Sequence, residues 1–500
     1  MRSLGIPHRI GSMSFILSGD DVCQATQPTP LPDPYWVAFS PSSAELVGIS
    51  LDKNNLPVDP TWLPVLAGNQ LSTSEHHFLN PISTVYSGHQ FGVWAGQLGD
   101  GRAILLGDIA GQELQLKGAG KTRYSRMGDG RAVLRSSIRE FLCSEAMHAL
   151  GIPTSRALSV VGSNMPVLRE TLETAAVCAR LAPSFIRVGH FEHFASTQNI
   201  ARLKELADLL MDQHYSECRN NKDPYLALFQ KISERNAILV AQWQAVGFCH
   251  GVLNSDNISV LGLTIDYGPF GFLDQFQMDH ICNHSDQGGR YAYHRQPQIM
   301  HWNMACLASA FIPLLELDHS EEEAKKLLTN ALSEFPIIFE KAWQTLFRRK
   351  LGLIKEQEED IELIERLLKM MHDARVDFTK LFRGLAQINT NAPISQIEAR
   401  NDFIDRDAID QWFSDYIVRL QAESTVDADR KQRMNAVNPK YILRNHLAQA
   451  AIEKAQQQDF SEVAKLLSVL EGPFDEQGQY QEYANPPPPD LEFIEVSCSS

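Results

Sequence analysis

The stretch "GFCHGVLNSDNISVLGLTIDYG", residues 247–268, holds the side chains best suited to chemistry. Its loop "HGVLNSDN" contains Asp256 and Asn257, and Asp266 follows an apolar run. Carboxylate and amide oxygens are ligands that Mg²⁺ prefers, and an Asp at the end of a buried strand needs a partner such as a metal. We therefore expect a metal site at Asn257 and Asp266; a structural cap is the alternative for Asp266. Asp256, the only carboxylate of the loop, is the candidate for accepting a hydroxyl proton. His250 is expected to shape the loop rather than to react.

The loop is close to the protein-kinase pattern H-R-D-x-x-x-x-N, but Val252 stands where a kinase has its catalytic Asp. The other kinase features occur in the kinase order: a Gly-rich hairpin, Lys117 ending a strand, Glu140 in the next helix, the loop and then Asp266. Each feature is weak alone, but the order predicts a kinase-type pair of lobes. A displaced base is compatible with attack on a different phosphorus atom.

Phosphate-binding features precede the loop. "GQLGDGR" contains Gly99, Gly101 and Arg102, and glycines let backbone N–H groups approach a phosphate; a plain hairpin turn is the alternative. Lys117 could contact phosphate oxygens while Glu140 holds it by an ion pair, the alternative being two surface side chains.

Basic side chains are concentrated between Lys117 and Glu140. This segment contains seven basic residues and only two acidic ones, Asp129 and Glu140. In a chain of net charge −16 this segment predicts a positive patch for a polyphosphate. A solvated basic helix is the alternative; it explains Arg135 and Arg139 but not the glycine-rich part, 118–130. Arg180 and Arg187, on either side of Pro183, could clamp phosphate oxygens, or could be ordinary surface residues.

The elements that must position these residues predict an α+β fold. We expect strands at 103–109 and 113–117 joined by a turn, a helix within 128–153, and strands at 157–163 and 165–173. Residues 191–246 and 299–470 should be mostly helical, with a buried helix before the loop, two short strands at 258–260 and 263–265, and a solvated acidic helix face within 355–368.

These expectations divide the chain into five parts. They are an N-terminal wrapping segment with few clear elements (1–80), a kinase-like N-lobe (81–190), a C-lobe (191–320), a helical extension (321–484), and a Pro-rich linker with a cysteine-containing tail (485–500).

Composition excludes several classes of partner. The net charge of −16 argues against nucleic acid, and no apolar run approaches the length of a membrane span. The eight cysteines are irregularly spaced, which indicates a reducing compartment rather than a zinc or disulfide scaffold. The N-terminus is either a weak organelle presequence or, more simply, a leader before a second start at Met13.

The motifs resemble those of the SelO (YdiU-type) protein adenylyltransferases, a kinase-like family once called pseudokinases. The resemblance covers almost the whole chain and is carried by "GHQFGVWAGQLGDGRA", "LQLKGAGKTRYSRMGDGRAVLRSSIREFL", "HGVLNSDNISVLGLTIDYGPFGFLD", "MNAVNPKYILRN" and "VSCSS". It implies a two-lobed kinase-like fold in which ATP binds in a flipped orientation. AMP is then transferred to Ser, Thr or Tyr of a protein and pyrophosphate leaves.

The resemblance also assigns residues. It implies Mg²⁺, with Mn²⁺ as an alternative, at Asn257 and Asp266, Asp256 as proton acceptor, and Glu140 as the partner of Lys117. The implied nucleotide contacts are Gly99, Gly101, Arg102, Lys117, Asp129, Gly130, Arg180, Arg187 and Asp266.

A redox role is implied as well. Cys498 matches the position of selenocysteine in eukaryotic relatives, and Cys282 is our choice of partner for a disulfide; an idle tail thiol is the alternative.

Two other functions stay open. "QPQIMHWNMACLASAF" is similar to a segment of small-molecule kinases, so a phosphotransferase acting on a protein or small-molecule hydroxyl is the first. A non-catalytic nucleotide-binding pseudokinase is the second. We expect a monomer, in the cytoplasm of a bacterium or the mitochondrion of a eukaryote.

Overall fold

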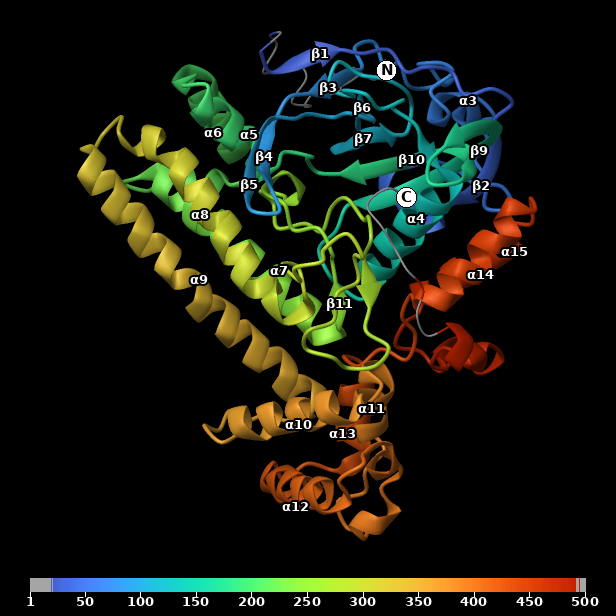
Figure 1. Cartoon of the computed structure of the whole chain (residues 1–500), viewed down its shortest axis with the longest axis vertical. Coiled ribbons are helices and arrows are strands. Elements are labelled where there is room, and N and C mark those ends of the chain that lie inside the picture. The colour runs from blue at the N-terminus through green and yellow to red at the C-terminus, as the bar shows by residue number, and fades with distance from the viewer. Residues whose placement is uncertain (1–18, 20, 492–493, 495–500) are drawn as a thin grey trace, which may run out of the picture.

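The upper lobe is built on an antiparallel sheet (Figure 1). The structure, a computed structural model, describes residues 19, 21–491 and 494, so the expected leader and second start at Met13 lie outside the described residues. The strands follow the order β1-β3-β6-β7-β10-β9-β2, and β8 pairs with β10. Their bounds are β1 Cys23–Ala25, β2 Tyr35–Phe39, β3 Ile82–Thr84, β6 Ala103–Ile109, β7 Gln112–Lys117, β8 Ala132–Val133, β9 Arg156–Leu168 and β10 Leu172–Ala182.

The β6–β7 hairpin confirms the predicted turn. Ala110 and Gly111 both have positive φ, 51° and 78°, the backbone that a two-residue hairpin requires. The pairing sets Lys117 opposite Ala103 of β6 and Cys178 of β10. The register therefore fixes Lys117 at the very end of β7.

Two strand predictions were wrong in detail. β9 runs unbroken through residue 164, where the two predicted strands are separated, and the real turn lies between β9 and β10. The two runs after the loop form no named strand within the described chain; Ser259 and Thr264 make isolated bridges to Arg187 and Thr154. Each run meets a single segment of the upper lobe, which is too little for a ladder.

The first 80 residues are more regular than expected. β1 and β2 form the two ends of the strand order. Two short helices, α2 (Pro41–Val47) and α3 (Trp62–Leu66), bury Val47, Trp62 and Leu66 in the core on the same side of the sheet as Leu114 and Leu116. The segment thus belongs to the upper lobe's core rather than only wrapping it.

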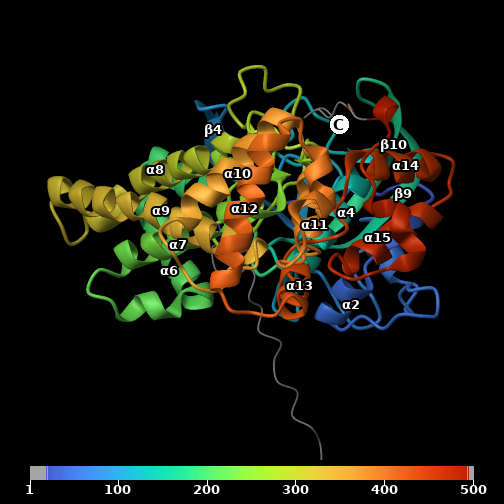
Figure 2. The same ribbon diagram turned by 90° about the horizontal axis from the view of Figure 1, so that it is seen from below.

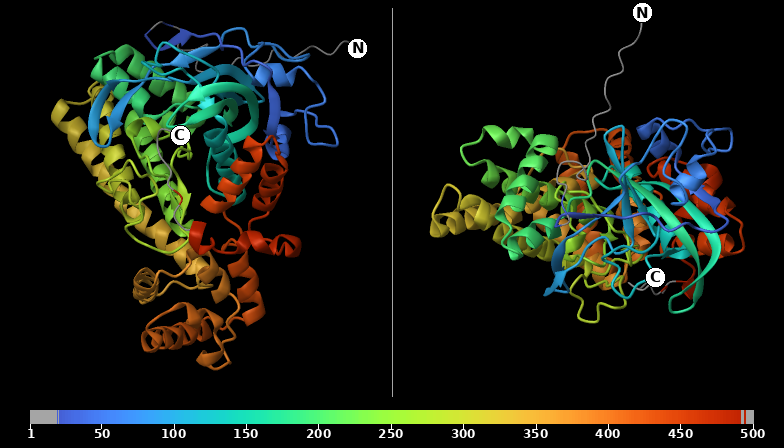
Figure 3. Two further views of the ribbon diagram at one scale, coloured as in Figure 1. Left: turned by 45° about the vertical axis from the view of Figure 1, so that its right-hand side comes forward. Right: turned by 90° about the horizontal axis from the view of Figure 1, so that it is seen from above.

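Helix α4 (Leu134–Ala149) carries Glu140 and packs against β9 and β10. It begins later than the predicted range, because Gly130 adopts φ 72° and residues 132–133 are used as β8. α14 (Asn445–Gln456) and α15 (Ser461–Glu471) return from the far end of the chain to pack on α4 (Figure 3).

The lower lobe is helical, as predicted. α7 (Pro224–Val246) is the expected buried helix and packs against α8 (Gln296–Leu315) and α9 (Glu321–Lys350). α5 (Val188–Ser196) and α6 (Ile200–His214) join the lobes. There are also two separate two-stranded pairs: β4 (Ser87–Gln90) with β5 (Val93–Gln97), and β11 (Phe248–Cys249) with β12 (Gly271–Phe272). The segment between β11 and β12 contains the loop with Asp256 and Asn257. The two lobes together form the predicted α+β fold.

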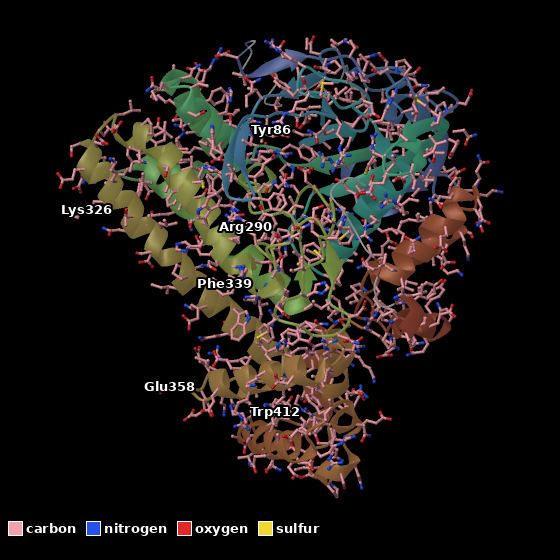
Figure 4. The ribbon with its side chains drawn as sticks, viewed as in Figure 1. Tyr86, Arg290, Lys326, Phe339, Glu358 and Trp412 are labelled. Atoms are coloured by element: carbon pink, nitrogen blue, oxygen red, sulfur yellow. The ribbon has the colours of Figure 1, made fainter. Side chains whose placement is uncertain are left out.

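The helical extension has a second core, seen from below in Figure 2. It contains α10 (Asp360–Ala374), α11 (Phe378–Leu385), α12 (Arg406–Ala422) and α13 (Asp427–Asn435), with Trp412 buried among them (labelled in Figure 4). The predicted solvated acidic face is wrong at Asp360, which is fully buried and accepts a 2.6 Å hydrogen bond from Arg419. Among the described helices, none combines the length and apolarity needed to cross a membrane.

Candidate active site

A cleft of about 630 Å³ brings most of the predicted site residues together. Its walls come from the ends of β7 and β10, the segment 100–103, the segment 128–131 and the loop 252–269. The predicted residues that line it are Gly101, Arg102, Lys117, Asp129, Gly130, Arg180, Arg187, Asp256, Asn257 and Asp266. Gly99 and Glu140 are absent from this lining and lie behind it.

Lys117 and Glu140 form the expected ion pair. Lys117 Nζ lies 2.8 Å from Glu140 Oε2, and both side chains are buried, which excludes the surface alternative. Glu140 Oε1 also accepts a 3.0 Å hydrogen bond from Arg180 Nη1. Lys117 and Arg180 lie on neighbouring strands and on one face of the sheet, because Cys178 pairs with Lys117 and side chains alternate along a strand.

Arg180 and Arg187 are each 2% exposed, so the surface alternative fails for both. Arg180 Nη1 lies 2.5 Å from Asp266 Oδ1, and Arg187 Nη1 lies 2.6 Å from Asp266 Oδ2. Burial alone would raise the pKa of Asp266, but Arg187, Arg180 and Lys117 outweigh it and hold that pKa well below its usual range. Asp266 is therefore ionised and surrounded by three cations.

His250, at the start of the loop 250–257, contacts the backbone next to Asp266. Asp266 has φ 58°, an uncommon conformation for a residue other than Gly, and the preceding Ile265 carbonyl lies 2.9 Å from His250 Nε2. Burial lowers the pKa of His250, whose ring stacks on Trp243. These contacts match the structural role expected for His250.

Asp256 lies in a single turn of 3-10 helix, Ser255–Asn257, and is 7% exposed. Its Oδ2 accepts a long 3.4 Å hydrogen bond from Gln90, and its Oδ1 has no partner among the described residues. Burial raises the pKa of Asp256 to about 6. A buried carboxylate with an oxygen that has no hydrogen-bond partner is suited to receive a proton near neutral pH.

The residues predicted to hold a divalent metal fit one chemically. Asn257 Nδ2 donates to the Val252 carbonyl at 3.2 Å, which leaves the amide oxygen available. Asp266 stays ionised, and each carboxylate oxygen can accept more than one contact. A donor set of oxygens alone suits Mg²⁺ or Mn²⁺.

The glycine loop is closely packed. Gly99 has φ 143°, and a Cβ there would lie 2.4 Å from Tyr124 Cγ. Gly130 has φ 72°, and a Cβ there would lie 2.2 Å from the backbone of Gly120. Both positions therefore require glycine, and Gly99 shapes the loop from behind the cleft.

Gly99→Ala should displace this loop and weaken nucleotide binding by at least about tenfold, because a small misplacement of phosphate-binding groups is costly. Gly96→Ala is the matched control: it has φ 69°, but a Cβ there meets nothing within 4 Å. Nucleotide titration of both variants checks this, and equal affinities would contradict it.

The helical part of the basic segment does not join the patch, and the alternative of a solvated helix is wrong for Arg139. Arg135 pairs with Glu173 at 2.9 Å, and Arg139 is buried and donates to the Phe270 carbonyl at 2.7 Å. Arg131 lines the cleft but donates to the carbonyls of Thr29 and Pro30. The cations are instead gathered from distant segments.

Sequence reasoning missed several lining residues. Arg169, in the turn between β9 and β10, donates to both carboxylate oxygens of Asp129 at 2.8 and 2.9 Å. Tyr86, labelled in Figure 4, lies under the Arg187 guanidinium at 4.9 Å. Asp100 is 4% exposed and also lines the cleft. Nothing in the local sequence marked these residues, since each acts through a partner far along the chain.

The structure describes only one of the two cysteines of the predicted disulfide. Cys282 is buried, and its Sγ lies 3.5 Å from the Cys249 carbonyl. Cys498 lies outside the described residues. The pairing stays a prediction.

Below pH 6, a reaction that uses Asp256 as base should fall about tenfold per pH unit, because the protonated carboxyl cannot accept a proton. The pKa of Asp256, about 6, is raised above its usual value, so the active form is gained as pH rises. A kcat/KM profile from pH 5 to 8 measures this. A flat profile across that range would contradict the assignment.

Known proteins match the chain over nearly its full length. The family described as "Protein adenylyltransferase SelO" matches residues 21–471. Proteins from Burkholderia ambifaria and Burkholderia multivorans, each named "Protein nucleotidyltransferase YdiU", are 52% identical over 499 residues, covering 97% of this chain and 95% of theirs. A protein of that name from Burkholderia cenocepacia is 51% identical over a 510-residue alignment, covering 100% of this chain and 96% of its own.

Proposed function

The chain belongs to the SelO family of protein adenylyltransferases, and from this premise we propose how its cleft transfers AMP from ATP to protein hydroxyls. The acceptor is a Ser, Thr or Tyr side chain. The observation that carries the proposal is the Oδ1 of buried Asp256, unpaired within the described chain, in the same cleft as the cations around Asp266.

Asp256 takes the proton of the acceptor hydroxyl. The hydroxyl oxygen forms a bond to the α-phosphorus, and the bond from that phosphorus to the bridging oxygen breaks. The electron pair of that bond leaves with pyrophosphate. The raised pKa of Asp256 places it, at about 6, where it is largely ionised at neutral pH yet still basic.

Lys117, Arg180 and Arg187 neutralise the leaving pyrophosphate. Their positions are fixed before the reaction by Glu140, Gln115 and the backbone carbonyl of Asp256. Fixed cations in a buried site stabilise developing charge without reorganising at the moment of reaction. Asn257 and Asp266 would hold Mg²⁺, or Mn²⁺, which supplies further positive charge to the phosphate oxygens.

This arrangement supports the flipped nucleotide. The cations that would hold the outer phosphates come from β7, β10 and the segment that follows β10, and they surround Asp266, whereas the Asp256 carboxylate belongs to the preceding loop of the same cleft. A nucleotide with its outer phosphates on the cations leaves the α-phosphorus for the acceptor at Asp256. Gly101, Arg102, Asp129 and Gly130 complete the proposed contacts.

Labelled ATP separates the proposal from a phosphotransferase. With α-labelled ATP we expect counts in the protein acceptor, and with γ-labelled ATP we expect none there. Intact mass gives the same answer, because an AMP adduct and a phosphate differ plainly. Transfer of the γ-label alone would overturn the proposal, and transfer of neither would favour a nucleotide-binding protein without catalysis.

We also propose that the protein is a monomer and that it acts in the cytoplasm of a bacterium. The irregular cysteine spacing supports a reducing compartment. Sedimentation of the purified chain and fractionation of the cells that make it test these two points.

A further inference from the structure

Three side chains of types that bind zinc meet beside the catalytic loop. His89 lies on β4, Glu192 on α5 and Cys306 on α8. One ligand atom from each lies within 4.8 Å of the other two. His89 Nδ1 and Glu192 Oε1 are already 2.6 Å apart. The β4–β5 hairpin reaches from the upper lobe to α5 and α8 at this point (Figures 1 and 3).

We propose that His89, Glu192 and Cys306 bind one Zn²⁺ ion, with the fourth position open to water. Imidazole, carboxylate and thiolate are the three side-chain ligands that zinc takes, in a tetrahedral arrangement. The oxygen donors at Asn257 and Asp266 suit Mg²⁺ instead, so the two sites differ in the metal that they select.

The surroundings allow entry and hold the ligands. Glu192 is nearly buried, whereas the His89 side chain is 26% exposed, which gives an ion a path from solvent. The rings of Trp94 and Trp302 lie 5.0 and 5.2 Å from the His89 ring and limit its rotation. The site is therefore shaped before an ion arrives.

Charge balance at the cluster is consistent with a divalent ion. Burial raises the pKa of Cys306 to about 12, with Glu192 adding to the effect, so the free thiol keeps its proton. Zinc would bind the sulfur and release that proton to solvent. The thiolate and the Glu192 carboxylate would then balance the ion's two charges. Arg290, which stacks on Trp302 at 4.7 Å, opposes the ion and limits its affinity.

The ion would tie the two lobes together next to Asp256. Ser255 donates its hydroxyl hydrogen bond to Glu192 Oε2, and its Oγ accepts from the His89 backbone N–H at 2.8 Å. The proposed ligands come from the β4–β5 hairpin, from α5, which joins the lobes, and from α8 of the lower lobe. Zinc is therefore expected to raise the melting temperature of the full chain.

The test uses full-length, metal-free protein and needs no assay of AMP transfer. We expect one Zn²⁺ per chain in competition with a chromogenic chelator, and a thiolate-to-metal absorption band when Co²⁺ replaces Zn²⁺. Cys306→Ser should abolish that band and the rise in melting temperature. His89→Ala should weaken binding by at least about tenfold.

His319→Ala is the matched control, because His319 pairs with Asp223 at 2.7 Å without a cysteine beside it. It should bind zinc like the unchanged chain. Equal zinc affinity in Cys306→Ser and the unchanged chain, or a Co²⁺ complex without a thiolate band, would overturn the proposal. Either result would leave the adenylyltransferase proposal untouched.

Discussion

Asp256→Asn should slow AMP transfer by about 10²- to 10⁴-fold, the usual contribution of a positioned general base. The amide has nearly the shape of the carboxylate but cannot take the hydroxyl proton. Nucleotide affinity should change little, because the cations that hold the phosphates lie on other elements. Early-time incorporation of α-labelled AMP and a nucleotide titration measure the two effects separately.

Asp100→Asn is the control for this prediction. Asp100 is the other buried carboxylate of the cleft whose pKa burial raises, but its Oδ2 is occupied by the backbone and hydroxyl of Thr84 at 2.8 and 2.6 Å. Its loss should slow transfer by less than about tenfold, since it is not placed to act as the base. A larger loss in Asp100→Asn than in Asp256→Asn would reverse the assignment.

The residues that the sequence placed correctly are those whose positions depend on local order. Lys117 ends a strand, Glu140 lies one helix later, and Asp256 and Asp266 lie within one short stretch. A strand end and a loop position are encoded by neighbouring residues, so the Lys117–Glu140 pair could be predicted before any contact was known. The β6–β7 turn was predictable for the same reason.

Contacts between distant segments could not be predicted in this way. The two bonds from Arg180 and Arg187 to Asp266 depend on the register of β10 against β7 and on the path of the loop beneath it. The sequence shows that Arg135 and Arg139 are charged. It does not show that Arg135 forms an ion pair with Glu173, or that Arg139 donates a hydrogen bond to the Phe270 carbonyl. The charge of a segment can be counted from the sequence, whereas the burial of each side chain and its bonding partners are known only from the fold.

The same limit applies to β9. Its residues 162–164, "GSN", are typical of a turn, yet they lie inside a strand because Gly162 pairs with both Tyr35 and Ala176. Tertiary pairing outweighs local preference there. Because the predicted strand at 165–173 spans the real turn, Arg169 was not recognised as a turn residue. In the structure this turn places Arg169 against Asp129.

Asp266→Asn should lower the free energy of unfolding by about 3–5 kcal/mol, the cost of removing one partner from a buried charge cluster. It leaves Arg180, Arg187 and Lys117 buried with Glu140 as their remaining close carboxylate among the described residues. Urea titration of the nucleotide-free protein measures the change. The same variant should lose AMP transfer, since it removes a proposed metal ligand.

ATP without metal should recover part of this lost stability, because the triphosphate supplies negative charge to the cations that Asp266 no longer balances. The increase in melting temperature with ATP is therefore expected to be larger in Asp266→Asn than in the unchanged chain. Asp212→Asn is the control: Asp212 pairs with Arg219 at 2.7 Å on the surface, where such a pair contributes about 0–1 kcal/mol. If Asp266→Asn cost no more than Asp212→Asn, or if ATP stabilised it less than the unchanged chain, the charge cluster would not be the phosphate-binding part of the cleft.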